Sequence, residues 1–179
     1  MIRNLKYSYE QVSWTYKQNE VNLKLNDVIF ASEDTENSYV YIDCGENYET
    51  KKVYFFDFNG NLLMNYDLEN GHITWKVDSF AKEIHIPKLL LVGYFPRKEL
   101  LLIMYQGRHR EVIAFDINGE FLFEVTKPEG CEMMYFQEFS DYVTVVCDGD
   151  DSQTDKFGRR RFNFKLNLKT GDLIRKGLA

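Results

Sequence analysis

Hydrophobic and polar residues alternate along most of the chain, which is the pattern of half-buried β-strands. The alternation is clearest in residues 39–44 and 52–58, and it returns in residues 111–117 and 161–168. No stretch repeats its hydrophobic positions at the spacing of a long amphipathic helix. We therefore expect an all-β protein, in which residues 79–83 form one short helical turn.

A short turn sequence separates pairs of these predicted strands and occurs more than once. Phe56-Asp57-Phe58-Asn59-Gly60 is matched by Phe115-Asp116-Ile117-Asn118-Gly119, with weaker copies that end at Gly71 and Gly171. Asn-Gly accepts positive φ at both central positions, as a type I′ hairpin turn requires. Each copy therefore predicts a strand, a tight turn of this type and a second strand.

Three strand-like segments precede each main turn and one follows it, so the predicted strands group into repeated units. The units cover residues 27–67, 88–126 and 133–176, within a single all-β domain of residues 1–179. Further strands are expected in residues 7–25 and 73–77. Each unit thus contains four antiparallel strands.

Such four-stranded units resemble the blades of a β-propeller of the WD40 or quinoprotein-like kind. The resemblance rests on the final hairpin of each unit, such as Phe115-Asp116-Ile117-Asn118-Gly119-Glu120, and the Gly-His and Trp-Asp pairs of true WD40 repeats are missing. It implies a small or incomplete β-propeller with three clear units plus extra N-terminal strands. Those N-terminal strands are expected to complete the last unit and close the ring. The alternatives are an open curved sheet and a β-sandwich.

The charge of the chain narrows the classes of partner. There are 22 Lys and Arg residues against 28 Asp and Glu residues, which gives a formal net charge of −6 and a pI near 5.2. Nucleic-acid binding depends mainly on Lys and Arg contacts to phosphate, so this composition argues against it. An acidic surface is compatible with a basic protein partner.

Cysteine usage and apolar runs indicate the compartment. The chain has three cysteines, an odd number without a CxxC pair: Cys44, Cys131 and Cys147. We therefore expect neither a disulfide framework nor a zinc ribbon. Each is expected to pack as a small apolar residue. The N-terminus lacks the apolar segment of a secretory signal, and the apolar runs are too short to span a bilayer. We therefore expect a cytoplasmic protein without membrane contact.

Irregular loops are predicted on the rim opposite the Asn-Gly turns, and function most often resides in such loops. They comprise residues 45–50, 106–110 and 148–160, with the connections 68–87 and 127–132. The partner-binding residues predicted from them are Glu46, Tyr48, Glu49, Arg108, His109, Asp148, Asp150, Asp151 and Asp155.

These loops contain no recognisable catalytic or metal-binding motif. The acids of residues 148–155 lack the spacing of an EF-hand, and the cations of residues 156–161 are expected to pair with them. His109 lies between two arginines, with neither a nucleophile nor an orienting carboxylate at a diagnostic spacing. We predict no catalytic residue, no metal and no cofactor.

This profile favours a non-enzymatic protein-binding module that acts through an acidic loop rim. It is similar, as a class, to the bacterial immunity proteins that neutralise toxins, in which an acidic surface covers a basic nuclease. The alternative is a small carbohydrate-binding or hydrolytic propeller-like enzyme, whose paired carboxylates would meet only in space. An exposed tryptophan in a pocket would favour that alternative. A structural module of a larger assembly is the third reading.

Overall fold

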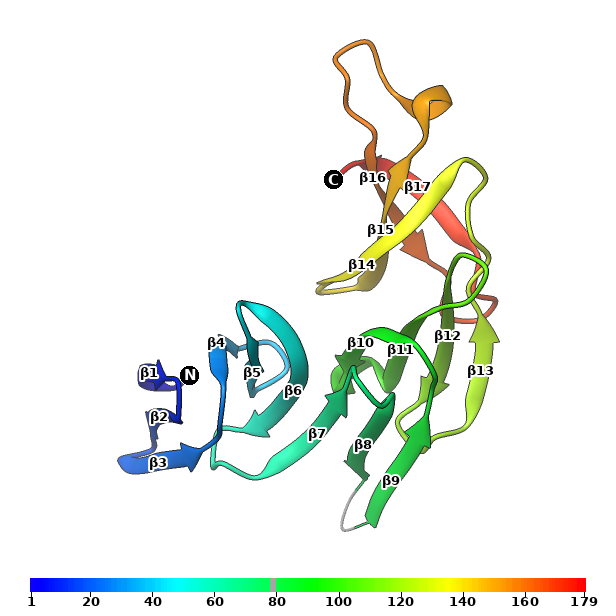
Figure 1. Cartoon of the computed structure of the whole chain (residues 1–179). Coiled ribbons are helices and arrows are strands. Elements are labelled where there is room, and N and C mark those ends of the chain that lie inside the picture. The colour runs from blue at the N-terminus through cyan, green and yellow to red at the C-terminus, as the bar shows by residue number, and fades with distance from the viewer. Residues whose placement is uncertain (78–79) are drawn as a thin grey trace. The chain divides into compact units, whose positions relative to one another are not determined.

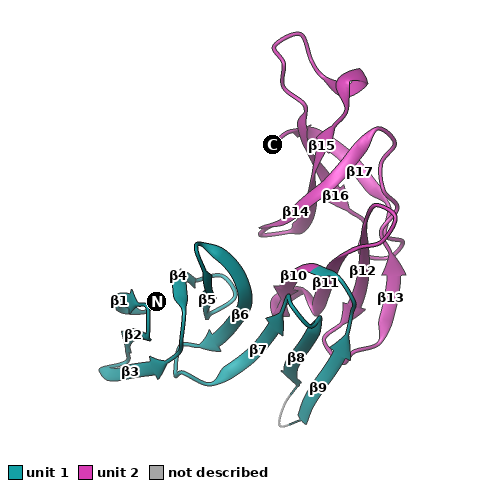
Figure 2. Cartoon of the chain, in the orientation of Figure 1, with its two compact units in different colours: residues 1–89 teal, residues 90–179 magenta. Residues whose placement is uncertain are grey.

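The computed structural model describes residues 1–77 and 80–179, and it consists of antiparallel β-strands joined by turns (Figure 1). The strands form four sheets, and the chain divides into two compact units, residues 1–89 and 90–179 (Figure 2). The only helical segments among the described residues are the 3-10 turns η1 Pro96–Lys98 and η2 Asp151–Gln153. No helix in this part of the chain is long and apolar enough to cross a membrane. The all-β prediction is confirmed, and the number of propeller blades stays a prediction.

Unit 1 begins with a three-stranded sheet of β1 Arg3–Ser8, β2 Gln11–Tyr16 and β3 Asn19–Lys24. Val12 and Trp14 project from β2 into a core that they share with Ile42 of the neighbouring sheet and with Phe58, which lies in a turn of that sheet. The Trp14 Nε1–H donates to the carbonyl oxygen of Phe58 at 2.8 Å. The prediction that these strands complete the last unit is wrong. They bury their apolar side within unit 1, and the last sheet has four strands of its own.

The second sheet of unit 1 has six strands in sequential order. They are β4 Val28–Asp34, β5 Tyr39–Glu46, β6 Glu49–Asp57, β7 Leu62–Asp67, β8 His72–Val77 and β9 Phe80–His85. Ile73 and Trp75 of β8 are buried, so β8 continues the sheet beyond β7. The predicted helical turn is wrong for residues 80–83, which pair with β8 as part of β9. Ser79 lies outside the described residues.

Unit 2 consists of two four-stranded sheets in which each strand pairs with the next along the chain. This is the strand order of a propeller blade. The first sheet contains β10 Leu89–Phe95, β11 Leu100–Gln106, β12 Arg110–Asp116 and β13 Phe121–Glu124. The second contains β14 Cys131–Phe139, β15 Tyr142–Gly149, β16 Arg161–Leu166 and β17 Leu173–Leu178.

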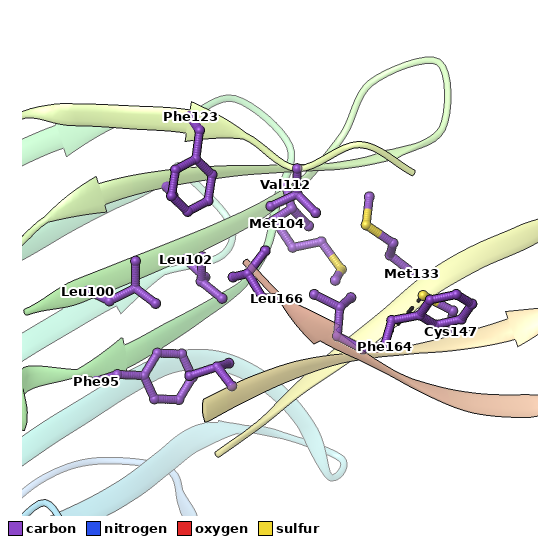
Figure 3. Close-up of a cluster of buried hydrophobic side chains, with 14 of the residues drawn as sticks. Phe95, Leu100, Leu102, Met104, Val112, Phe123, Met133, Cys147, Phe164 and Leu166 are labelled. Atoms are coloured by element: carbon purple, nitrogen blue, oxygen red, sulfur yellow. Dashed lines mark hydrogen bonds between the residues drawn. The ribbon is translucent and has the colours of Figure 1, made fainter. Parts of the chain in front are cut away.

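The two sheets of unit 2 share one hydrophobic core (Figure 3). Leu100, Leu102 and Met104 occupy alternate positions of β11, and Phe164 and Leu166 occupy alternate positions of β16. Successive side chains of a strand point to opposite faces, so this alternation brings one face of each sheet into the core. Burial of such apolar side chains is the main source of stability for the unit.

All three cysteines are free and buried. Burial raises the pKa of the Cys44 thiol to about 11 and that of the Cys147 thiol to about 12. Both groups are therefore neutral thiols at physiological pH rather than reactive thiolates. The prediction that the cysteines pack as small apolar residues is confirmed.

The two main Asn-Gly turns have a geometry different from the predicted type I′. In the first, the Gly60 N–H donates to the Asp57 carbonyl at 3.0 Å, and positive φ is confined to Gly60, at 87°. This is a type I turn followed by a left-handed glycine. The prediction is wrong because the Asp57 Oδ1 accepts the backbone N–H groups of Asn59, at 2.9 Å, and Asn61, at 2.8 Å. Those bonds stabilise this three-residue turn, in which the Asp57 N–H also donates to the Asn61 carbonyl at 2.9 Å. The turn at Gly119 is built in the same way, with φ also 87°.

Candidate functional site

The end of the six-stranded sheet opposite the Asp57 turn is formed by the β5–β6 turn and the β7–β8 turn. We refer to residues 44–51 and 67–71 as the loop end of unit 1. Lys51 lies between the two turns, with its Nζ 3.4 Å from Glu46 Oε2 and 3.3 Å from Glu69 Oε1. Both carboxylates are well exposed, so these pairs add little to stability but fix the local arrangement of charge.

The β5–β6 turn has two residues, because Glu46 pairs directly with Glu49 across it. Asn47 and Tyr48 both have positive φ, at 52° and 63°. This is the type I′ geometry, which normally carries glycine at its second position. Here a tyrosine takes that place, and its side chain is 92% exposed.

A depression of about 500 Å³ lies beside this turn. Its wall mixes cationic and anionic side chains, and these include Lys24, Lys51, Lys52, Asp27, Glu46 and Glu69. Cys44 also lines it, as a protonated thiol and therefore a weak nucleophile. Trp14 and Trp75 are both buried, so neither indole is available to stack on a sugar ring. In residues 1–77 and 80–179 no group of three or more His, Cys, Asp or Glu side chains could hold a metal ion.

Three loops come together at one end of unit 2, which we call the loop end of unit 2: residues 107–110, 127–132 and 148–160. The Arg110 N–H donates to Glu132 Oε1 at 3.0 Å, which connects the first loop to the second. The Asp150 N–H donates to the Gly130 carbonyl at 2.8 Å, which connects the second to the third. The structure therefore brings Arg108 and His109 to the same end of the unit as the predicted aspartates.

The aspartates of this loop end are largely matched by its own arginines. Arg160 Nε lies 3.6 Å from Asp148 Oδ2, and Arg160 Nη1 lies 3.8 Å from Asp151 Oδ1. Arg159 Nη2 lies 2.8 Å from Asp155 Oδ2. The expected pairing of acids and bases within the loop is confirmed for Arg159 and Arg160. Residues 148–161 contain four acidic and four basic side chains. This surface therefore has little net charge with which to attract a basic partner.

The tip of the β15–β16 loop is organised around Asp155. Its Oδ1 accepts the N–H groups of Phe157, at 2.8 Å, and Arg159, at 3.0 Å, while its Oδ2 accepts the Arg159 Nε–H at 2.8 Å. Phe157 is 69% exposed, with the cations of Lys156 and Arg159 near its ring. The sequence predictions missed Phe157. An aspartate three residues before Gly158 is a turn signal that could have pointed to the aromatic residue between them.

Local hydrogen bonds lower the pKa of two aspartates in this loop. The Ser152 hydroxyl, followed by backbone N–H groups, lowers the pKa of Asp150. The Arg159 backbone N–H, followed by the Arg159 side chain, lowers the pKa of Asp155. Both carboxylates are poor proton donors and act here as acceptors that hold the loop.

The predicted binding residues thus fall into two groups. Glu46, Tyr48 and Glu49 share the loop end of unit 1. Arg108, His109, Asp148, Asp150, Asp151 and Asp155 belong to the loop end of unit 2. The first group lies on a single turn, and the second group lies on two loops that residues 127–132 connect.

Comparisons with known proteins give little further guidance. No family model matches the chain, and no curated protein matches it. One similar solved structure is the dihydro-heme d1 dehydrogenase NirN in complex with DHE, at 9% sequence identity and a TM-score of 0.45. The match covers 99% of this chain and 47% of that chain, so the present chain spans about half the length of NirN. A likeness of this size assigns neither a shared fold nor an activity.

Proposed function

We infer that this protein is a binding module for a protein partner with a basic surface, and that Tyr48 is the centre of the contact. The observation that carries this function is the exposure of Tyr48 at a backbone position suited to glycine. A left-handed conformation costs a non-glycine residue roughly 1–2 kcal/mol. Tyr48 is 92% exposed, so its ring gains little packing energy in the folded protein. We therefore attribute the tyrosine at this position to binding of a partner.

Tyr48 has the properties of an interface anchor. A tyrosine offers a large apolar ring with a polar hydroxyl, and such residues are enriched among those that dominate binding energy. The turn that holds it is short and paired on both sides, since Glu46 faces Glu49 and Gly45 faces Thr50. A contact residue on a rigid turn loses less conformational entropy on binding than one on a mobile loop.

The charge distribution supports a basic partner. Residues 1–89 contain 14 acidic and 9 basic side chains, a net charge of −5, whereas residues 90–179 contain 14 and 13, a net charge of −1. The acidity of the chain is thus concentrated in the unit that presents Tyr48. Glu46 and Glu49, both exposed, flank the turn. Opposite charge on a partner would speed association and orient the encounter.

An immunity-type inhibitor that covers a basic toxin or nuclease is one specific form of this function. The net charge of unit 1 and the exposed turn are compatible with it, and the contact would then involve Glu46, Tyr48 and Glu49. The loop end of unit 2 suits this role less well, because Arg159 and Arg160 already pair with its aspartates. Phe157 is an exposed aromatic residue on that surface, and it therefore serves as the comparison for Tyr48 in the experiment.

The proposal is tested by capture from the native cell with three baits: the wild-type protein, Tyr48→Gly and Phe157→Ala. We expect the wild type and Phe157→Ala to retain the same basic protein. Tyr48→Gly should bind it at least about tenfold more weakly, because loss of an anchor typically costs 2 kcal/mol or more. Binding should also weaken as salt is raised.

Equal capture by the wild type and Tyr48→Gly would contradict the proposal. So would the absence of any protein partner together with sugar binding or substrate turnover by the purified chain.

A further inference from the structure

Two of the three histidines of the chain face each other on neighbouring strands of unit 1. His72 of β8 pairs in register with His85 of β9, and the centroids of the two rings are 5.1 Å apart. Both side chains are exposed. Because directly opposed residues of an antiparallel pair lie on the same face of the sheet, both rings can be reached together from solvent.

The backbone hydrogen bonds of the two strands keep these side chains close. The Ile86 N–H donates to the Gly71 carbonyl at 2.9 Å, which brackets His72 and His85 on one side. Opposed residues bracketed in this way form a non-hydrogen-bonded pair, the closer of the two kinds of antiparallel pair. The approach of the two imidazoles is therefore set by the sheet and not by side-chain flexibility alone.

The separation of the rings matches the requirement of a shared metal ion. Zinc binds histidine nitrogen at about 2.0–2.1 Å, which places each ring centroid about 3.2 Å from the ion. Two imidazoles on one tetrahedral ion then have centroids about 5 Å apart. The observed 5.1 Å agrees with this arrangement.

We propose that His72 and His85 form a binding site for a divalent transition-metal ion of the zinc or nickel type. Imidazole is a preferred ligand for these ions. Asp67 lies opposite His72 on β7, but its carboxylate is held by Lys52, at 3.2 Å, and by the Asn70 amide, at 3.1 Å. Among the described residues no third His, Cys, Asp or Glu side chain joins the two imidazoles, so water completes the coordination.

This coordination has two consequences. A site with open positions binds its ion exchangeably and can accept a further ligand from another molecule, as catalytic and bridging ions do and closed structural sites do not. The ion also connects β8 to β9, the strand at the edge of the sheet. Because the two imidazoles adopt this arrangement only in the folded chain, metal binding stabilises the folded state.

The test is titration of the full chain, without any histidine tag, with Zn²⁺ and Ni²⁺ in a calorimeter. We expect one ion to bind per chain. His85→Gln should weaken binding by about tenfold or more, because a second ligand on the same scaffold acts at high effective concentration. His109→Gln is the matched control, since His109 is the remaining histidine and lies in unit 2, and it should bind as the wild type does.

A second measurement locates the ion without a substitution. In NMR spectra of the wild type, paramagnetic Ni²⁺ should broaden the amide signals of β8 and β9 before those of residues near His109. Unchanged binding by His85→Gln, loss of binding by His109→Gln, or broadening centred elsewhere would each overturn the proposal.

Discussion

Tyr48 occupies a backbone position that costs the folded protein stability. Its φ of 63° places a bulky residue where glycine is the usual choice, and its ring is almost fully exposed. Residues with such a cost tend to occur at functional sites, where binding and not folding explains them. A stabilising substitution that removes function is the expected signature of this trade-off.

We predict that Tyr48→Gly makes the protein more stable. Relief of the left-handed conformation gains roughly 1–2 kcal/mol. Glycine has more conformational freedom in the unfolded chain, and this lowers the gain in folding stability by about 0.5–1 kcal/mol. Chemical denaturation should therefore show an increase of about 0.5–1 kcal/mol in the free energy of unfolding. Phe157→Ala is the control, and it should change this free energy by less than about 0.5 kcal/mol because its ring is also exposed. A loss of stability in Tyr48→Gly would show that the ring serves the fold.

The sequence alone identified Tyr48 as a loop residue but not as a strained one. The strain depends on the register of β5 and β6, which makes the turn two residues long. That register is set by side chains along the whole hairpin, such as Ile42 and Phe56, which pack in the core. At Gly60 the Asn-Gly pair predicted a type I′ turn that the structure does not contain, because the Asp57 side chain selects a type I turn.

At the scale of elements, several hairpins end in related turns of two lengths, because the glycine N–H donates to the residue three positions earlier at Gly60 and Gly119 and to the residue four positions earlier at Gly71 and Gly171. An aspartate or asparagine begins each turn and a left-handed glycine closes it, with φ of 87° at Gly60, 74° at Gly71, 87° at Gly119 and 78° at Gly171. The side chain of the first residue accepts backbone N–H groups within the turn. The repeated motif is therefore a structural feature that closes hairpins at both ends of the six-stranded sheet.

We predict that Asp57→Ala destabilises the protein by about 1–2 kcal/mol. Each lost hydrogen bond contributes about 0.5–1.5 kcal/mol, and the hydrogen bonds to this carboxylate are exposed to solvent. The Asp57 carboxylate accepts three bonds, from two backbone N–H groups and from the Asn61 amide. Urea denaturation measures the change. Asp141→Ala, at an exposed aspartate in the turn between β14 and β15, should change stability by less than about 0.5 kcal/mol. Equal effects of the two substitutions would contradict the assigned role of Asp57.

Strand positions could be predicted from local alternation, but strand partners could not. The segment of β8 was expected, whereas its pairing with β7 depends on Ile73 and Trp75 finding a buried face in a six-stranded sheet. Likewise, β1 to β3 pack against β4 and β5 because Trp14 and Val12 fill the core there. Such choices depend on contacts between residues far apart in the sequence, which periodicity does not encode.

At the scale of the whole molecule, the distribution of charge separates the two candidate surfaces. Residues 1–89 carry a net charge of −5 and present Tyr48, whereas the loop end of unit 2 balances its own charges and presents Phe157. The acidity of the chain was evident from composition. Its concentration in unit 1 could not be recognised from the sequence, because it depends on the boundary between the compact units and on the ion pairs of Arg159 and Arg160.

Site-specific photocrosslinking in the native cell tests whether a protein partner contacts Tyr48. A benzophenone amino acid replaces Tyr48 in one variant and Phe157 in the other, since both positions are exposed aromatic residues. We expect the group at position 48 to form a covalent adduct with a single basic protein, in a yield that falls as salt is raised before irradiation. The group at position 157 should give no such adduct. An adduct with that protein from position 157 alone, or no protein adduct from position 48, would show that Tyr48 is not the centre of the contact.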